Sequence, residues 1–402
     1  MKIVIIGGGA AGFFAAITAK ESNPQAEVII LEKGKQVLQK VKISGGGRCN
    51  VTHACFEPKE LIKFYPRGGK ELLGPFHTFM TGDTMGWFDD RGVPLKIEDD
   101  NRIFPESNTS QTIIDCFVKS AQTAGVELRL QQNVSAIEKV GSGFRLSIGE
   151  GELITDKLLI ATGSNPKVWE LIKSLGHEII TPLPSLFTFN IADKRIQDVP
   201  GVAVPHATVK VLGTKLEGFG PLLITHWGMS GPAILKMSSF GARVLAEKNY
   251  QFDLQVNWLS QSQEQIEEAL RELKQNQAKK QVALKSPFTE IPKRLWFQLV
   301  TAAEVKEESR WGELSNKQLI KLSLQLTQCQ FKANGKSTFK DEFVTAGGVN
   351  LKEINFKRFE SKLHKNLFFA GEVLDIDAVT GGFNFQNAWT GGYIAGTAMS
   401  EH

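Results

Sequence analysis

Cysteine is scarce in this sequence. Its four cysteines, Cys49, Cys55, Cys116 and Cys329, are too few and too scattered for a disulfide framework, and no C-x-x-C pair occurs among the 402 residues. The seven histidines are thinly spread and show no zinc-ligand spacing. We therefore expect no metal site, and a protein of the reducing cytoplasm.

Net charge and long apolar runs are modest as well. The formal net charge is +4 and the pI is about 8.7, which is too mild to indicate nucleic acid as a partner. One uncharged run extends between Lys2 and Lys20, but glycines interrupt it and no signal-cleavage pattern follows. A buried strand, a tight turn and a helix explain this run better than a membrane span, so we expect no membrane partner.

The first 33 residues predict a β-α-β unit that binds a dinucleotide. KIVII and EVIILEK are short apolar runs typical of buried parallel strands, and a helical stretch joins them. Between the first strand and the helix lies Gly7-x-Gly9-x-x-Gly12, and Glu32 ends the second strand, 20 residues after Gly12. The three glycines permit a tight turn, the approach of a pyrophosphate and close helix packing, in that order. The carboxylate of Glu32 would accept hydrogen bonds from ribose hydroxyls and repel a 2′-phosphate, which favours FAD or NAD over NADP.

A second glycine-rich element, near the C-terminus, favours FAD over NAD. Residues 368–392 combine an apolar strand, a turn containing Gly371 and Gly382, and a helix rich in small residues. In FAD enzymes the chain usually returns to the flavin near its C-terminus, and a helix N-terminus there could direct N–H groups at the pyrimidine end of the flavin. No second G-x-G-x-x-G lies between a strand and a helix, so NAD(P)H is expected only as a transient co-substrate.

The middle of the chain differs from its ends and predicts inserted domains. Short alternating stretches typical of β-strands fill 189–257, and about three helices follow in 262–329, the first behind a Ser262 cap. Residues 35–102 carry glycines and prolines and predict irregular structure. The predicted boundaries are 1–188 and 344–402 for the FAD-binding domain, 189–260 and 331–343 for a β-rich inserted domain, and 261–330 for a helical inserted domain.

The stretch SGGGRCNVTHAC, from Ser44 to Cys55, admits two interpretations. Three consecutive glycines could let the backbone run against the flavin and its phosphates, with polar contacts from Ser44, Arg48 and Asn50. Alternatively, Cys49 and Cys55 could form a redox pair, although five residues lie between them where flavin disulfide reductases usually have four. We prefer the cofactor cradle, in which Cys49 is a small neighbour of the isoalloxazine and the redox chemistry belongs to the flavin.

Six motifs, in order, resemble a known group of bacterial flavoproteins. GGGAAG, KISGGGRCNVT, LLIATGS, THWGMSGPAIL, FVTAGGV and AGEVLDIDAVTGGFNFQNAW look like the aminoacetone-oxidase-like or BaiN-like proteins over essentially the whole chain. The resemblance implies an α/β fold, in which a Rossmann-type, glutathione-reductase-like FAD-binding domain is built from both ends of the chain and carries inserted β-barrel-like and small α-helical domains.

The same resemblance implies a set of FAD contacts. Lys40 and Arg48 are expected to neutralise the pyrophosphate or hold a flavin anion. The full set is Gly7, Gly9, Ala10, Ala11, Gly12, Glu32, Lys33, Lys40, Ser44, Gly45, Gly46, Gly47, Arg48, Cys49, Asn50, Val134, Thr162, Gly163, Gly371, Glu372, Asp375, Gly382, Phe383, Asn384 and Gln386.

Together these patterns predict an FAD-dependent oxidoreductase. Hydride would pass between flavin N5 and a small or medium organic substrate, with NAD(P)H or O2 as the second substrate. One alternative is a disulfide reductase using Cys49 and Cys55, and another is an RNA-associated flavoprotein, supported only by the lysine-rich helices at 271–321. No catalytic acid or base is assigned, because the lone His226 is explained better by a turn leading into a helix that packs domains together than by a proton donor.

Overall fold

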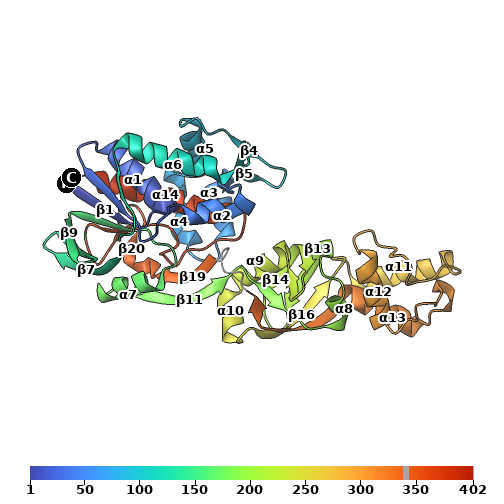
Figure 1. Cartoon of the computed structure of the whole chain (residues 1–402). Coiled ribbons are helices and arrows are strands. Elements are labelled where there is room, and N and C mark those ends of the chain that lie inside the picture. Colours follow the sequence, from blue (N-terminus) through green and yellow to red (C-terminus); the bar gives the residue numbers. More distant parts are fainter. Residues whose placement is uncertain (338–343, 402) are drawn as a thin grey trace. The chain divides into compact units, whose positions relative to one another are not determined.

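The computed structural model describes residues 1–337 and 344–401, which divide into two compact units. The first unit combines Met1–Leu183 with Lys340–His402, and the second comprises Pro184–Phe339 (Figure 1). The predicted boundaries of the β-rich and helical inserted domains remain a prediction, and residues 338–343 of the β-rich one lie outside the described residues.

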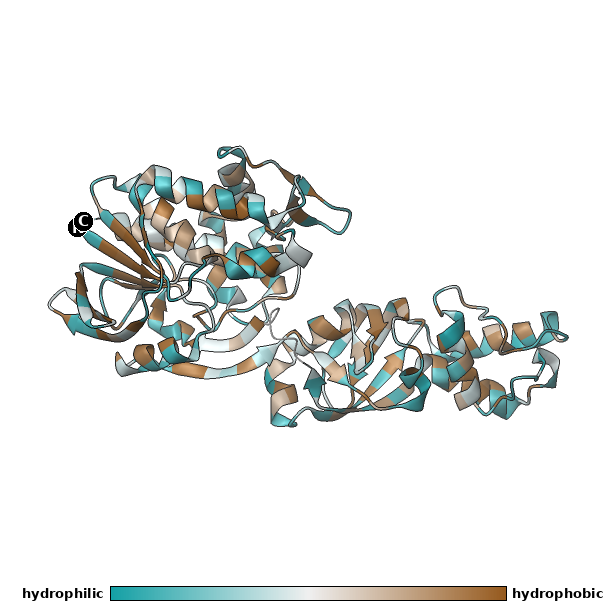
Figure 2. Cartoon of the chain, viewed as in Figure 1, coloured by the Kyte–Doolittle hydropathy of each residue, from teal (hydrophilic) through white to brown (hydrophobic). Residues whose placement is uncertain are grey.

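A seven-stranded sheet forms the centre of the first unit. Its order is β20-β21-β22-β10-β1-β2-β6, and the strands from β22 to β6 pair in parallel. β10 and β22 are buried at every residue, so other elements cover both faces of the sheet. The strands around β1 are coloured as apolar in Figure 2. The strands are β1 (Lys2–Ile6), β2 (Glu27–Leu31), β6 (Glu127–Arg129), β10 (Lys157–Ile160), β20 (Ile354–Asn355), β21 (Glu360–Ser361) and β22 (Leu367–Phe369).

Two helices from opposite ends of the chain pack side by side in this unit. α1 (Ala10–Ser22) follows β1, and α14 (Phe383–Ser400) lies against it (Figure 1). Cβ atoms at Gly392 and Gly396 would lie 2.8 and 2.6 Å from the backbone oxygens of Ala11 and Ala15. The absence of these side chains therefore lets the two helix backbones approach each other.

Short strands and helices surround this core. Three further sheets have the orders β3-β5-β4, β7-β8-β9 and β11-β19. Their strands are β3 (Thr52–His53), β4 (Leu95–Ile97), β5 (Arg102–Pro105), β7 (Val134–Val140), β8 (Gly143–Ile148), β9 (Gly151–Thr155), β11 (Ile179–Ser185) and β19 (Val344–Val349). The helices are α2 (Gln39–Gly47), α3 (Pro58–Leu61), α4 (Gly69–Thr78), α5 (Thr81–Asp89), α6 (Ser110–Ala124) and α7 (Pro166–Ser174).

Residues 35–102 are more regular than the sequence predicts. The prediction of irregular structure is wrong, because this segment contains four helices, from α2 to α5, and two strands. Pro75 lies inside α4, and glycines in α4 and α5 obscure the apolar period on which a sequence-based assignment depends. Burial of Leu72, Phe76 and Phe88 supplies the stability that intrinsic helix propensity lacks here.

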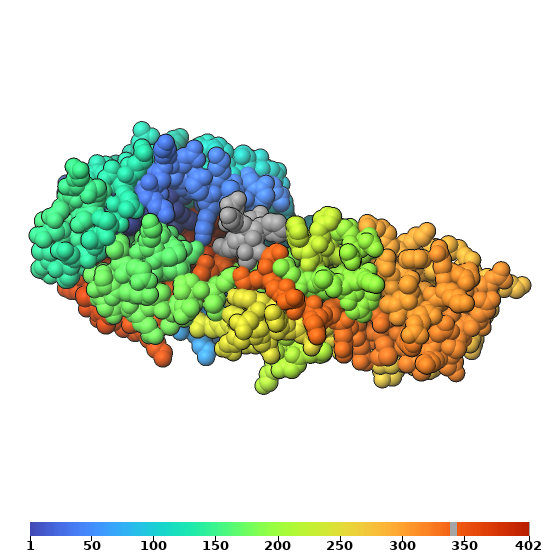
Figure 3. All heavy atoms as spheres, turned by 60° about the horizontal axis from the view of Figure 1, so that its bottom comes forward, coloured from blue at the N-terminus to red at the C-terminus, as the bar shows by residue number. Residues whose placement is uncertain are grey.

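The second unit is built on an antiparallel sheet of order β17-β16-β13-β14-β15-β12-β18. Ser262 caps α11 through a capping box with Gln265, which confirms the predicted cap. Figure 3 shows the helical segment, in orange, at one end of this unit. The elements are β12 (Thr188–Asn190), α8 (Lys194–Gln197), β13 (Ala203–Val211), β14 (Glu217–Ile224), β15 (Gly228–Ser230), α9 (Pro232–Phe240), α10 (Ala242–Glu247), β16 (Gln251–Asn257), α11 (Gln263–Asn276), α12 (Lys293–Ala302), α13 (Asn316–Thr327), β17 (Cys329–Asn334) and β18 (Lys336–Ser337).

Within 1–337 and 344–401, no helix is long and apolar enough to cross a membrane. In the same ranges, His, Cys, Asp and Glu side chains form no group of three or more that could hold a metal ion.

Candidate FAD site

The turn between β1 and α1 has the geometry of a phosphate-binding loop. A Cβ atom at Gly7 would lie 2.5 Å from the Ala161 oxygen, and one at Gly12 would lie 2.0 Å from the Gly7 oxygen. At Gly9, in contrast, the nearest described atom would be 4.0 Å away. Gly7 and Gly12 are thus required by packing, whereas Gly9 leaves an open approach to the backbone.

The first turn of α1 offers unpaired donors at this opening. Gly9 is the N-cap, and the first intrahelical bond joins the N–H of Phe13 to the Gly9 oxygen. The N–H groups of Ala10, Ala11 and Gly12 therefore have no acceptor within the helix, and the helix dipole adds partial positive charge. This arrangement fits the pyrophosphate of FAD.

Glu32 lies directly after β2 and is held by backbone donors. Its Oε2 accepts from the N–H of Gly8 at 2.9 Å, and its Oε1 accepts from that of Gly34 at 2.7 Å. Each carboxylate oxygen keeps a second lone pair for a ribose hydroxyl, so the predicted role fits the geometry. Lys33, the next residue, is exposed. The Gln132 N–H donates to the backbone oxygen of Glu32 at 2.9 Å, so the segment that precedes Val134 lies next to Glu32.

A second group of predicted residues meets at the end of β10. Gly163 has a positive φ of 61°, and its Cβ would lie 3.6 Å from Glu372 Oε2 and 3.9 Å from Lys40 Nζ. Lys40 and Glu372 form an ion pair, so the charge expected to neutralise phosphate is already compensated in this structure. Thr162 Oγ1 is buried and makes no hydrogen bond with the residues that the structure describes. A buried hydroxyl without a protein partner is the kind of group that a cofactor satisfies.

The three glycines after Ser44 form a left-handed turn. Gly45, Gly46 and Gly47 have φ values of 57°, 69° and 84° and are exposed. A Cβ at Gly45 would meet Phe104 and Asn50 at 2.9 Å, but at Gly46 and Gly47 no described atom lies within 4 Å. The last two positions therefore combine a backbone that favours glycine with open space, as a cofactor cradle requires.

Arg48 is engaged within the protein. Its Nη1 lies 2.6 Å from Glu98 Oε1, and its guanidinium carbon lies 3.9 Å from the centroid of the Phe104 ring. A contact of Arg48 with FAD remains a prediction, and the structure adds that this cation already has a carboxylate partner.

The cysteines of this stretch are poor nucleophiles. Cys49 is fully buried, and burial raises its thiol pKa to about 12. Burial also raises the pKa of Cys55, and both cysteines are free. Asn50–His53 ends in strand β3 rather than in a helix. Two protonated thiols on this backbone argue against the alternative of a disulfide reductase.

The N-terminus of α14 lies against β3. A Cβ at Gly382 would lie 2.6 Å from the carbonyl group of Thr52, and the Asn50 amide oxygen, in the orientation that satisfies its neighbours, accepts from the Gly382 N–H at 3.0 Å. The first intrahelical bond runs from the Gln386 N–H to the Gly382 oxygen. The N–H groups of Phe383, Asn384 and residue 385 thus have no intrahelical acceptor and could meet the flavin, as predicted.

The side chains of this first turn face the protein. Gln386 is buried, and its Oε1 accepts from Thr52 Oγ1 at 2.6 Å and from Thr84 Oγ1 at 3.0 Å. The Asn384 amide makes two hydrogen bonds with the Ala378 backbone. The Phe383 ring stacks on Phe64 with centroids 4.2 Å apart. For these predicted residues, only the backbone is placed to contact a cofactor.

The structure adds two residues that sequence reasoning missed. Arg67 forms an ion pair with Asp377, whose side chain is fully buried. This pair holds the loop before α14 in place. His53 lies 4.5 Å from Phe383, ring to ring, and burial lowers its pKa, so it is neutral at pH 7. Arg67 is 310 residues from Asp377 in sequence, and no local pattern links the two.

The glycine turn, Glu32 and the two helix N-termini define a Rossmann-fold FAD-dependent oxidoreductase. This class agrees with the predicted fold and cofactor. The chain belongs to the family described as "HI0933-like protein Rossmann domain", whose profile matches residues 1–398. The predicted resemblance to BaiN-like flavoproteins is thereby confirmed.

Individual relatives extend over nearly the whole chain. This chain is 29% identical over 399 residues to the ribosomal RNA dihydrouridine synthase of Escherichia coli strain K12, and the match covers 96% of this chain and 95% of that protein. It is 27% identical over 413 residues to the 3-dehydro-bile acid delta(4,6)-reductase of Clostridium scindens, covering 100% and 99%. The structure of 3-ketosteroid-delta4-(5alpha)-dehydrogenase from Rhodococcus jostii RHA1 superposes with a TM-score of 0.52 at 13% identity, over 100% of this chain and 96% of that one. This last likeness concerns the fold.

Proposed function

We propose that this protein reduces a carbon–carbon double bond conjugated with a carbonyl group, using electrons that NAD(P)H delivers to FAD. One observation carries the proposal. Two relatives that match nearly the whole chain are named for saturating such a bond, in a steroid-like enone in one case and in uracil in the other. The shared chemistry, rather than either substrate, is what we transfer to this chain.

The site has residues that fit FAD, the hydride donor of this reaction. Bound and reduced, FAD supplies a hydride at N5. The α1 N-terminus and Gly9 would hold its pyrophosphate, Glu32 its ribose, and the backbone of the first turn of α14 its pyrimidine end. Because burial raises the pKa of Cys49 and Cys55, both thiols are protonated at neutral pH, and we assign the redox chemistry to the flavin rather than to them.

Anaerobic photometry of the bound flavin tests the proposal. NADH or NADPH should bleach the flavin absorbance, and an α,β-unsaturated ketone should restore it without oxygen. A panel of saturated ketones of matched shape is the control and should leave the flavin reduced. Bleaching by primary amines, followed by reoxidation with O2 alone, would instead identify an amine oxidase and contradict the proposal.

Uracil in RNA is a second candidate substrate, because of the charge and surface of the second unit. Residues 184–339 hold 20 lysines and arginines against 14 aspartates and glutamates, so the excess positive charge of the +4 chain lies there. Phe219 and Trp227 of the same unit are 60% and 55% exposed. Exposed aromatic faces on a unit of net positive charge suit single-stranded RNA.

RNA binding at two salt concentrations distinguishes this candidate. If RNA is the substrate, affinity for a ribosomal RNA fragment should fall steeply from 50 to 200 mM salt, by about a hundredfold or more. Phe219→Ala and Trp227→Ala should weaken it further, whereas Phe56→Ala, an exposed aromatic of the first unit, should not. The absence of any RNA complex at low salt would remove this candidate and leave the first intact.

A further inference from the structure

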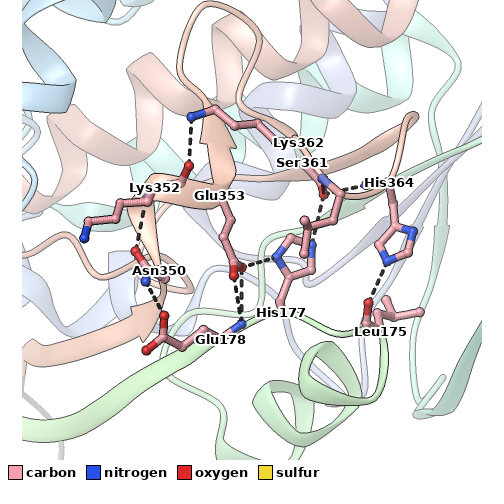
Figure 4. A network of polar contacts seen from close by, with 10 residues as sticks. Leu175, His177, Glu178, Asn350, Lys352, Glu353, Ser361, Lys362 and His364 are labelled. Carbon is pink, nitrogen blue, oxygen red and sulfur yellow. Dashed lines mark hydrogen bonds and ion pairs between the residues drawn. The ribbon is translucent and has the colours of Figure 1, made fainter.

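A buried polar network lies where β11 begins and β19 ends, apart from the fingerprint glycines (Figure 4). The side chain of His177 is fully buried. Its Nδ1 lies 2.6 Å from Glu353 Oε2, and its Nε2 lies 3.0 Å from Ser361 Oγ. The three residues come from the loop after α7, the turn before β20 and the end of β21, so the network joins three segments of the first unit.

The hydroxyl of Ser361 determines which nitrogen of His177 carries the proton. Ser361 Oγ accepts from the N–H groups of Leu363 at 3.0 Å and His364 at 2.9 Å. Because these bonds use both lone pairs, the hydroxyl proton must point at His177 Nε2. Nε2 is then an acceptor, and the ring proton lies on Nδ1 and is donated to Glu353. A neutral imidazole of this tautomer satisfies every group in the network.

Protonation of His177 breaks this arrangement. A proton on Nε2 would present a third donor to Ser361 Oγ and would leave the hydroxyl proton without its acceptor. Burial lowers the pKa of His177, and the hydrogen bond to Glu353 only partly opposes this. Because the folded pKa lies below the ordinary 6.5, stabilisation by the network is complete above about pH 6.5 and is lost as pH falls through the lowered value.

Other charged groups around the network do not replace Glu353 as the partner of His177. The His364 ring lies 5.9 Å from that of His177, and its Nε2 is bonded to the Leu175 oxygen at 2.6 Å. Glu178 contacts Asn350 through its carboxylate, and Lys362 Nζ donates to the backbone oxygen of Lys352 (Figure 4). An additional positive charge at His364 would further disfavour a charged His177.

The network is connected to residues 371–375, which include the predicted FAD contacts Glu372 and Asp375, through Asn350 and β19. The Asn350 N–H donates to the Glu178 oxygen at 3.0 Å, and the Glu178 N–H donates to Glu353 Oε2 at 3.2 Å. Asn350 directly follows Val349, whose N–H donates to the Val373 oxygen at 3.0 Å. Two further bonds join β19 to residues 371–375. The Asp375 N–H donates to the backbone oxygen of Val349 at 3.2 Å, and the Thr345 N–H donates to Glu372 Oε1 at 3.3 Å.

We propose that His177, Glu353 and Ser361 form a pH-sensitive positioning device for residues 371–375, so that acidification weakens the retention of FAD. The proposal rests on the proposed contacts of Glu372 and Asp375 with FAD. None of the three positioning residues needs to contact the cofactor, because hydrogen bonds join β19, next to the network, to residues 371–375. The device would release FAD in a compartment or a culture that turns acidic.

FAD titrations of the apoprotein at pH 7.5 and 5.5 test this device. The dissociation constant of the wild type should rise about five- to tenfold at the lower pH, a typical size for coupling between sites. His177→Asn should bind FAD more weakly at pH 7.5 and lose most of the difference between the two pH values. His77→Asn, which removes an exposed histidine of the same unit, should keep the wild-type ratio.

The outcomes separate this device from the FAD site itself. An unchanged dissociation constant in the wild type, or a wild-type pH ratio in His177→Asn, would overturn the device and leave the proposed function standing. If Glu372→Gln binds FAD at pH 7.5 as tightly as the wild type does, the proposed contact between residues 371–375 and FAD is wrong. A wild type that binds FAD at neither pH would contradict the proposed function instead.

A measurement on the wild type avoids dependence on the folding of a variant. Hydrogen exchange of the amides in 344–349 and 371–375, corrected for the intrinsic effect of pH, should lose protection at pH 5.5. The amides of β1 and β10 serve as the internal control and should keep theirs. Equal protection of both regions at the two pH values would also overturn the device.

Discussion

Two glycine clusters of the first unit look alike in sequence and differ in physical reason. At Gly7 and Gly12, a Cβ would lie 2.5 and 2.0 Å from backbone oxygens, so the protein itself fills the space. At Gly46 and Gly47, a Cβ would have no described atom within 4 Å, but φ is 69° and 84°. Gly7 and Gly12 of the first cluster therefore meet a packing requirement, whereas Gly46 and Gly47 of the second cluster meet a backbone requirement that leaves room for a ligand.

Gly12→Ala should have the largest effect, because it adds a methyl group where no space exists. We expect a loss of more than about 3 kcal/mol in the free energy of unfolding, since backbone rather than a flexible side chain would have to move. Denaturant unfolding of the apoprotein measures it. A loss below about 1 kcal/mol would mean that α1 and β1 can separate and that the first cluster is not set by packing.

Gly9→Ala should separate cofactor binding from folding within the first cluster. Gly9 has φ −96° and ψ −169°, which alanine adopts readily, and its Cβ would lie 4.0 Å from the nearest described atom. Stability should change by less than about 0.5 kcal/mol, whereas FAD affinity should fall about tenfold or more because the methyl group lies where pyrophosphate approaches. Unchanged affinity by isothermal titration would place the phosphates elsewhere.

Gly46→Ala should show a smaller effect on both quantities. The left-handed backbone costs a non-glycine residue about 1 kcal/mol of stability. Gly92→Ala is the matched control, because Gly92 also has a positive φ, 72°, and no described atom within 4 Å of a Cβ. Both variants should lose similar stability, but only Gly46→Ala should weaken FAD binding. Equal FAD affinity in the two would show that the second cluster is an ordinary surface turn.

Cys55→Ser should have the smallest effect. Because burial raises the pKa of this thiol, it is protonated at neutral pH, and we expect turnover with NAD(P)H to stay within about twofold of the wild type. Steady-state kinetics measure this. A loss of turnover, with FAD still bound, would support the alternative of a disulfide reductase and a redox role for the segment that follows the second cluster.

The sequence predicts those parts of the fold that local patterns encode. The spacing of Gly7, Gly9 and Gly12 between an apolar strand and a helix predicts the β-α-β unit, and the second glycine-rich element at 368–392 adds the preference for FAD. The partners of Lys40 and Arg48 could not be predicted, because Glu372 and Glu98 come from distant segments. The inward orientation of Phe383 depends likewise on Phe64, which lies in a segment without a clear period.

The contact between α1 and α14 has a consequence for the synthesis of the protein. Residues 10–22 leave the ribosome long before residues 383–400 exist, and at about 5 to 20 residues per second the interval is roughly 20 to 70 s. During that time the small-residue face of α1, with Ala11 and Ala15, has no helix to cover it. The nascent α1 therefore lacks this packing partner until synthesis is nearly complete, and arrest of translation before residue 383 should leave α1 more open to proteases.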